Sequence, residues 1–147
     1  MYMRSILFRW LPVLVWAAVI FLVSANPDPY RALPQSWAGS TGPVGAEASS
    51  RDELLGRFLH VGEYALLGAL TLRALGWHKQ PGPAVLLAAL GLCGLYGLSD
   101  ELHQIFVPGR AFQLLDLALD LGGALSGVAL YLHFCQSRRN SNVQSGL

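Results

Sequence analysis

Residues 84–110 read AVLLAALGLCGLYGLSDELHQIFVPGR, a long apolar run followed by two carboxylates, an imidazole, an amide and, last, a guanidinium. A transmembrane helix needs about 20 mainly apolar residues to cross roughly 30 Å of hydrocarbon, and residues 84–103 supply that length. An ionisable side chain inside such a span costs about 2.5–3.5 kcal/mol on insertion scales. We therefore interpret residues 84–103 as a transmembrane helix whose polar end belongs to a functional site.

The composition points to the same class of protein. Of the 147 residues, 53% are hydrophobic and 13% are charged, whereas about 25% charged residues are usual in soluble domains. Three further apolar stretches, at about residues 6–24, 54–77 and 112–134, also approach spanning length. The sequence predicts an all-α membrane protein in which a bundle of four transmembrane helices forms a single domain over residues 1–147. The net charge of +1 and the lack of a basic cluster exclude a nucleic-acid partner.

The first apolar stretch has two interpretations. Small residues at its end, Val23-Ser24-Ala25, also fit a cleaved secretory signal peptide. The near-spanning length of the run, with Trp10 and Trp16 inside it, favours a retained helix. Residues 25–53 then contain four prolines among glycine, serine and alanine, a composition that breaks helices and predicts a loop outside the membrane.

Lysine and arginine residues indicate the orientation, because cytoplasmic segments carry an excess of them. With four antiparallel spans, both termini and the connection at residues 78–83 share one side. If Arg57 and Arg110 are assigned to the polar positions described below, that side has six Lys and Arg residues and the other side has two. We predict cytoplasmic termini, an extracytoplasmic loop at residues 25–53, and a multi-pass protein of the bacterial inner membrane.

Polar residues in three of the predicted spans lie at similar depths. At a rise of 1.5 Å per residue, His60, Asp100 and Asp120 fall roughly 8–12 Å inside the outer boundary. Asp100 also shares a helix face with His103 and Gln104. We therefore predict one outward-facing polar pocket within the membrane. The candidate ligand-binding residues are Arg57, His60, Glu63, Tyr64, Asp100, Glu101, Gln104, Arg110, Asp116 and Asp120.

A stripe of small residues follows the two aspartates of the last span. It runs from Asp120 through Gly123 and Ala124 to Gly127, and it contains the Gly-x-x-x-Gly spacing that lets membrane helices approach closely. We predict that this face packs against another helix and not against lipid. A homo-oligomer through Gly123 and Gly127 is one form that the contact could take.

The arginines of the predicted pocket favour an anionic ligand. Arg57 and Arg110 lie near the outer boundary, where the headgroup of a lipid would be found. Arginine binds phosphate or carboxylate with two parallel hydrogen bonds. In this interpretation Asp116 and Asp120 neutralise and orient the arginines.

Other chemistries fit the same residues. Paired with Asp100 or Glu101, His60 would serve acid–base catalysis, so these three are the candidate catalytic residues and enzymatic activity stays an open question. A metal is disfavoured because no His-Glu-x-x-His or similar helical pair is present, and we expect no cofactor. Proton-linked transport through the carboxylates is a further alternative. A purely structural role for the charges is another, although helix association needs far fewer ionisable groups.

Three motifs of the chain resemble the VanZ-like family. They are Arg57-x-x-His60-x-x-x-Tyr64, then Asp100-Glu101-x-x-Gln104-x-Phe106-x-Pro108-Gly109-Arg110, and Asp116-x-x-x-Asp120-x-x-Gly123-x-x-x-Gly127, within residues 54–131. The chain departs from the family at Arg57 and Asp120, where the family often has lysine and asparagine.

The resemblance implies a role in the cell envelope, and the founding member is associated with resistance to the glycopeptide antibiotic teicoplanin. It does not supply a reaction. Together with the polar positions, it leads us to expect that the protein binds an anionic amphiphile, either a membrane lipid or a lipid-linked envelope precursor. A membrane-embedded hydrolase or transferase acting on such a lipid is the alternative.

Overall fold

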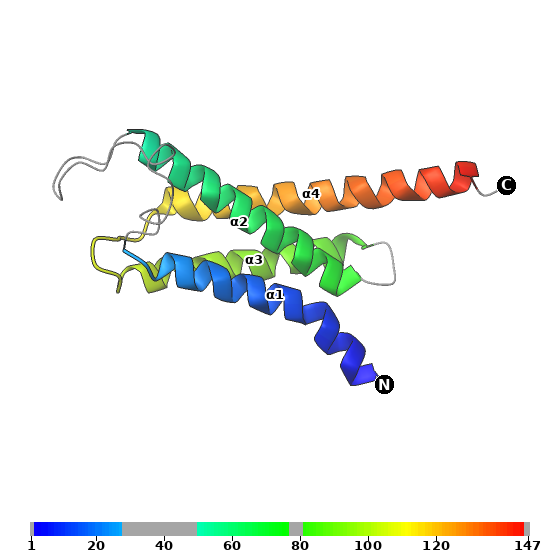
Figure 1. Cartoon of the computed structure of the whole chain (residues 1–147), viewed down its shortest axis with the longest axis horizontal. Coiled ribbons are helices and arrows are strands. Elements are labelled where there is room, and N and C mark those ends of the chain that lie inside the picture. The colour runs from blue at the N-terminus through cyan, green and yellow to red at the C-terminus, as the bar shows by residue number, and fades with distance from the viewer. Residues whose placement is uncertain (1, 28–49, 77–80, 146–147) are drawn as a thin grey trace.

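The computed structural model describes the backbone of residues 2–27, 50–76 and 81–145 and the side chains of residues 6–27, 57–76 and 81–141. These residues form α1 (Tyr2–Ser24), α2 (Ser50–Gly76), α3 (Pro83–Gln104) and α4 (Leu114–Ser145). Successive helices run in opposite directions, so α1 and α3 end where α2 and α4 begin (Figure 1). Most of the predicted loop at residues 25–53 lies outside the described residues.

The helices overlap the predicted spans, but α1 and α2 begin four residues before them, so that α2 starts within the predicted loop, and α4 ends later. α1 ends at Ser24, as predicted, and α3 begins at Pro83, where a proline is tolerated because the first N–H groups of a helix have no intrahelical partner. α4 continues to Ser145, past the predicted end of the span at residue 134, and projects beyond the other helices (Figure 1). Residues 135–145 are mostly polar but contain no glycine or proline that would end the helix.

Three of the helices are long and apolar enough to cross a membrane. These are α1, α3 and α4, with mean hydropathies of 2.3, 1.5 and 1.4. Large apolar side chains such as Phe8, Leu22 and Leu87 are 68, 69 and 70% exposed. Lipid tails solvate such a surface, whereas water would drive it to aggregate. α2 carries more charge and is not one of these three.

α2 and α3 lie at the centre of the bundle, since each contacts all three of the other helices. The closest approach of α2 is to α4. A methyl group added at Gly123 would lie 2.5 Å from the carbonyl oxygen of Val61, and one added at Gly127 would overlap the carbonyl oxygen of Ala65. Only glycine allows the two backbones to come so close. The prediction that this glycine face packs against another helix is therefore confirmed.

The helix on the glycine face is α2 of the same chain. Because its backbone occupies the space above Gly123 and Gly127, a second copy of the protein has no room to pack there. Gly123 and Gly127 thus serve a contact within one chain, and a homo-oligomer stays a prediction. Any homo-oligomer would have to use another surface.

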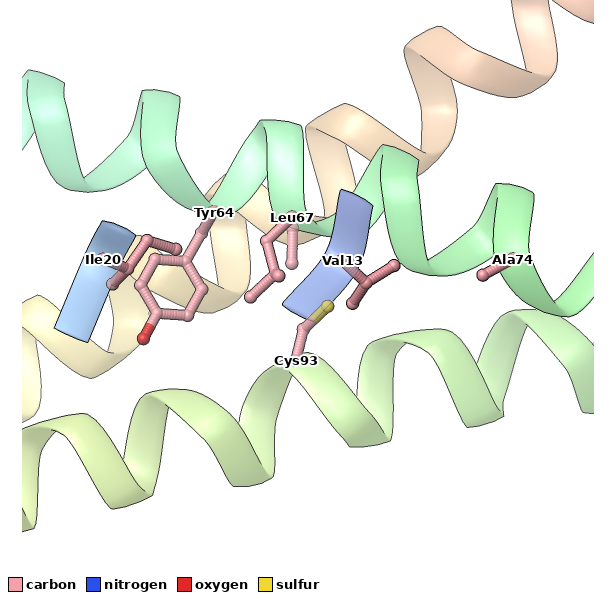
Figure 2. Packing of buried hydrophobic residues seen from close by; sticks show 7 residues of the cluster. Val13, Ile20, Tyr64, Leu67, Ala74 and Cys93 are labelled. Carbon is pink, nitrogen blue, oxygen red and sulfur yellow. The ribbon is translucent and has the colours of Figure 1, made fainter. Parts of the chain in front are cut away.

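An apolar core lies between α1, α2 and α3 and ends next to the polar residues (Figure 2). Val13 of α1, Leu67 of α2 and Cys93 of α3 are at most 7% exposed. Ile20 packs beside Tyr64 at the polar end of this core (Figure 2). Among the described residues α1 and α4 make no contact, so α1 rests on α2 and α3 alone.

A tight turn connects α3 to α4. The N–H of Arg110 donates to the carbonyl oxygen of Val107 at 3.1 Å. Between them, Pro108 precedes Gly109, whose φ of +80° is a conformation that favours glycine. The turn brings Arg110 and the start of α4 next to the end of α3.

Candidate functional site

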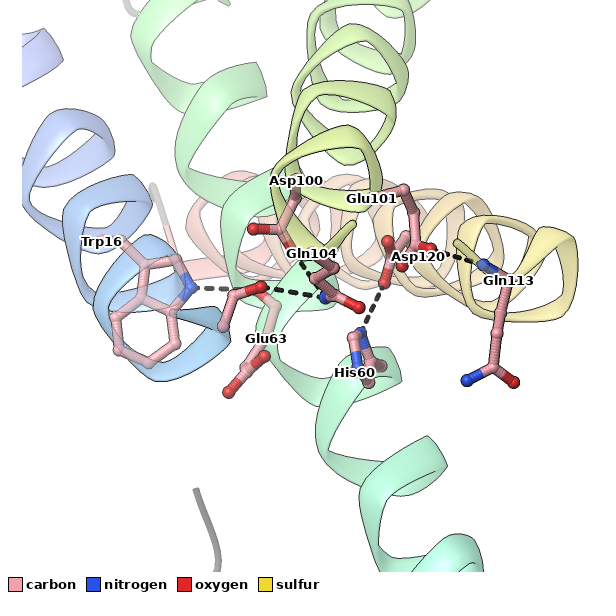
Figure 3. Close-up of polar contacts among 9 residues, drawn as sticks. Trp16, His60, Glu63, Asp100, Glu101, Gln104, Gln113 and Asp120 are labelled. Atoms are coloured by element: carbon pink, nitrogen blue, oxygen red, sulfur yellow. Dashed lines mark hydrogen bonds and ion pairs between the residues drawn. The ribbon is translucent and has the colours of Figure 1, made fainter. Parts of the chain in front are cut away.

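Polar side chains from different helices gather at the end of the bundle where α3 ends and α4 begins (Figure 3). Asp100, Glu101, Gln104 and Asp120 are at most 2% exposed, which is rare for polar and charged side chains without a functional or structural role. We call the side chains gathered here the polar cluster. It consists of Ser24, His60, Glu63, Tyr64, Asp100, Glu101, Gln104, Arg110, Asp116 and Asp120.

The central contact of the polar cluster joins α2 to α4. His60 Nδ1 lies 3.0 Å from Asp120 Oδ1, and the two side chains are 12% and 1% exposed. The sequence predicted that Asp120 would orient the arginines, but its hydrogen-bonded partner is His60. The close crossing of α2 and α4 at Gly123, one turn after Asp120, explains this pairing, since it holds the imidazole within reach of the carboxylate.

Gln104 connects α3 to α1. Its Nε2 atom donates to Ser24 Oγ at 2.9 Å and lies 3.3 Å from Asp100 Oδ2 (Figure 3). Ser24 is 4% exposed and was not among the predicted site residues. Its position could have indicated this role, because Ser24 lies in the last turn of α1 at the same depth as Gln104 in the parallel helix α3.

Glu101 ties the two ends of the α3–α4 connection together. Its Oε2 atom accepts a hydrogen bond of 2.8 Å from the backbone N–H of Gln113, which directly precedes α4 (Figure 3). The first N–H groups of a helix need such acceptors, so this contact supports the start of α4. Asp100 and Glu101 are adjacent in sequence, yet they contact different helices.

Gly97 makes room for the inner part of the polar cluster. A methyl group at this position would lie 3.4 Å from both Asp120 Oδ2 and Tyr64 Cε1. Tyr64 is fully buried, and its ring centre is 6.2 Å from that of Tyr96. The phenol from α2 and the carboxylate from α4 thus both reach the backbone of α3 at Gly97.

α1 is attached to the cluster through groups that the sequence analysis did not assign to the site. Trp16 Nε1 donates to the backbone oxygen of Glu63 at 2.9 Å (Figure 3), and Tyr96 donates its hydroxyl to the backbone oxygen of Ala17. His103 was predicted to share a face with Asp100. Its ring stacks on Phe21 of α1, with ring centres 4.5 Å apart, and it lies within electrostatic range of Asp100.

The predicted arginines lie at the margin of the polar cluster. Arg110 is half-buried within electrostatic range of Glu63, and its Nε atom has no hydrogen-bond acceptor among the residues that the structure describes. Asp116 is half-buried within electrostatic range of His60 and Glu101. Arg57 lies one helical turn before His60 and is also half-buried.

Several buried oxygens of the cluster have no hydrogen-bond partner within the described part of the chain. They are Tyr64 OH, Asp100 Oδ1, Glu101 Oε1 and Asp120 Oδ2. Buried polar atoms are normally hydrogen-bonded, so each of these oxygens has capacity for a further hydrogen bond. No three His, Cys, Asp or Glu side chains in the described ranges are arranged to hold a metal ion.

Comparison with known proteins assigns the chain to a family. A family model described as VanZ/LLP1 matches residues 8–136. The chain belongs to the VanZ/LLP1 family. The match confirms the resemblance found in the sequence, and it covers every residue of the polar cluster. Together with the three apolar helices, it identifies this VanZ/LLP1 protein as an integral membrane protein. No curated protein and no solved structure matches the chain.

Proposed function

We propose that this VanZ/LLP1 protein binds the anionic headgroup of a membrane lipid or lipid-linked envelope precursor in the polar cluster. The observation that carries the proposal is Arg110, whose Nε atom is buried without a hydrogen-bond acceptor among the described residues. Leaving a buried donor unsatisfied costs about 1–3 kcal/mol, and more for a charged group. A phosphate or carboxylate oxygen would satisfy it, with Arg57 as a second cationic group at the margin.

The unpartnered carboxyl oxygens narrow the class of headgroup. Asp100 Oδ1 and Asp120 Oδ2 can only accept hydrogen bonds when ionised, so they would repel a bare phosphate that came too close. A headgroup that presents its anion to Arg110 and hydroxyl or amino groups to these oxygens satisfies both halves of the cluster. Sugar-bearing or amine-bearing phospholipids and lipid-linked precursors have this combination.

In the proposed topology α2 also crosses the membrane, in addition to α1, α3 and α4. Its 27 residues extend over about 40 Å, enough for the hydrocarbon core. Its central position lets His60, Glu63 and Tyr64 face protein, which lowers the cost of polar groups at membrane depth. With both termini cytoplasmic, the polar cluster opens toward the outer face of the bacterial inner membrane.

Native mass spectrometry of the detergent-extracted protein tests the proposal. We expect a co-purified phosphate-bearing lipid on the wild type and at least about tenfold less on Arg110→Ala. Arg138→Ala is the matched control. Arg138 lies over the Phe134 ring, in the C-terminal half of α4, which is the half farther from the polar cluster. Equal lipid retention by wild type and Arg110→Ala, at equal thermal stability, would refute the assignment.

The His60–Asp120 contact favours a second candidate, hydrolysis of a phosphoester in the bound lipid. A carboxylate that holds Nδ1 leaves Nε2 to take a proton from water, whose oxygen would attack phosphorus as the bond to the leaving oxygen breaks. Asp100 in its protonated form would then protonate the leaving oxygen. His60→Gln should keep lipid binding and lose phosphate release, measured by phosphorus NMR. If the wild type releases no phosphate from any bound lipid, hydrolysis is refuted and lipid binding is the remaining function.

A further inference from the structure

An apolar groove runs along the outside of the bundle between α1 and α3. It is lined by Ala17, Ala18, Phe21 and Leu22 of α1 and by Tyr96 of α3, and its volume is about 400 Å³. Phe21 and Leu22 are 46 and 69% exposed, so the groove opens toward the lipid. Its volume lies within the range of small-molecule sites.

The groove exists because one large residue, Tyr96 of α3, faces two small residues, Ala17 and Ala18 of α1, and holds the two helices apart. The Tyr96 hydroxyl donates to the carbonyl oxygen of Ala17, which fixes the phenol between the two helices. The side chains of Ala17 and Ala18 are too small to fill the remaining space. α1 otherwise packs mainly on α2, so the gap beside α3 stays open.

The groove adjoins the polar cluster. Phe21 at its outer end stacks on His103, and Ser24, one turn further along α1, accepts the hydrogen bond from Gln104. On its inner side the Tyr96 ring approaches Tyr64. A molecule with its headgroup in the polar cluster would therefore have its apolar part directed along this groove.

We propose that the groove holds an acyl chain of the same lipid whose headgroup occupies the polar cluster, and that this lipid enters sideways from the bilayer between α1 and α3. This inference rests on the proposed function and adds a ligand class to it: the ligand is a membrane-embedded lipid and not a water-soluble anion. An acyl chain gains no hydrophobic free energy on leaving the bilayer. Selection therefore depends on close packing against Tyr96 and Phe21 and on headgroup contacts.

Photolabelling of the wild type in phosphatidylcholine nanodiscs tests where the chain lies. The test ligand is phosphatidylglycerol with a diazirine in one acyl chain, since its headgroup has both a phosphate and hydroxyl groups, and diacylglycerol with the same chain serves as the phosphate-free comparison. We expect labelling by phosphatidylglycerol at Phe21, Leu22 and Tyr96. Labelling spread over exposed side chains remote from the groove, such as Leu87 and Leu130, would overturn the inference.

Two alanine-to-phenylalanine variants distinguish lipid binding in the groove from lipid contact with the rest of the lipid-facing surface. Ala18→Phe fills the groove from its exposed edge and should lower labelling by phosphatidylglycerol about tenfold. Ala88→Phe adds the same ring to an exposed position of α3 outside the groove and should leave labelling unchanged. Equal labelling of Ala18→Phe and wild type would overturn the inference, as would an equal loss in Ala88→Phe.

Arg110→Ala distinguishes failure of the groove from failure of the headgroup site. If Arg110→Ala loses the preference for phosphatidylglycerol over diacylglycerol while Ala18→Phe labels normally, the headgroup proposal stands and the groove is refuted. If Arg110→Ala keeps the preference while Ala18→Phe loses labelling, the headgroup proposal is refuted and the groove is supported.

Discussion

The His60 imidazole meets the Asp120 carboxylate at 3.0 Å, although the two residues are separated by 60 positions in the chain. Asp120 is almost completely buried and His60 keeps part of its side chain exposed. The carboxylate therefore holds the ring from the inside and leaves its other edge toward the accessible part of the polar cluster.

Two substitutions of Asp120 should distinguish the contribution of its hydrogen bond to the free energy of unfolding from the contribution of its charge. Asp120→Asn keeps an oxygen that accepts from His60 Nδ1–H and should change the free energy of unfolding by less than about 1 kcal/mol. Asp120→Ala leaves the buried imidazole nitrogen without a partner and should cost about 1–3 kcal/mol. Thermal unfolding in detergent, followed by tryptophan fluorescence, measures both, and equal stability of the two variants would contradict the assigned contact.

Alanine substitutions at Gly127 and Gly122 should affect the free energy of unfolding differently. Gly127→Ala pushes a methyl group into the Ala65 carbonyl of α2 and should destabilise the bundle by about 1–3 kcal/mol. At Gly122 an added methyl group meets nothing within 4 Å, so Gly122→Ala should be neutral or slightly stabilising. The same unfolding assay compares them. A stable Gly127→Ala variant would show that α2 and α4 do not approach as described.

Glu101 should protect the start of α4. Glu101→Ala removes the acceptor of the Gln113 N–H, whereas Glu101→Gln keeps a carbonyl oxygen at the same place. We expect hydrogen–deuterium exchange at residues 113–117 to accelerate about tenfold in the alanine variant and much less in the glutamine variant. Unchanged exchange in Glu101→Ala would mean that other contacts hold this end of the helix.

The proposed orientation can be tested with single exposed cysteines in a Cys135→Ser background. Phe106 is 83% exposed in the turn after α3, and Ser141 is exposed near the end of α4. A membrane-impermeant maleimide added to spheroplasts should label Phe106→Cys at once and Ser141→Cys only after the membrane is permeabilised. Cys93, which is 2% exposed, serves as the unlabelled internal control. The reverse pattern would invert the topology.

The sequence was sufficient to predict the helical segments and the gathering of polar residues, because both depend on local properties. Span length determines the apolar runs, and a common depth brought His60, Asp100 and Asp120 to one level. Which partner each group takes depends on the distance between helices, which sequence spacing does not encode. Gly123 brings α2 close enough to α4 for His60 to reach Asp120, and this pairing was not predicted.

The contribution of α1 was the least predictable part of the candidate site. Ser24 and Trp16 are ordinary in the sequence of a membrane helix, and the backbone oxygens of Ala17 and Glu63 carry no sequence signal at all. Their roles depend on how α1 leans on α2 and α3. Polar patterning on the other three helices contains no information about that placement.

The long separation between His60 and Asp120 has a consequence for biosynthesis. A ribosome that adds about 5–20 residues per second needs roughly 3–12 seconds to add the 60 residues from Val61 to Asp120. Throughout that interval α2 exists without the helix that pairs with its polar face. We expect the insertion machinery to keep α2 beside it, or in a water-accessible place, until α4 has been made.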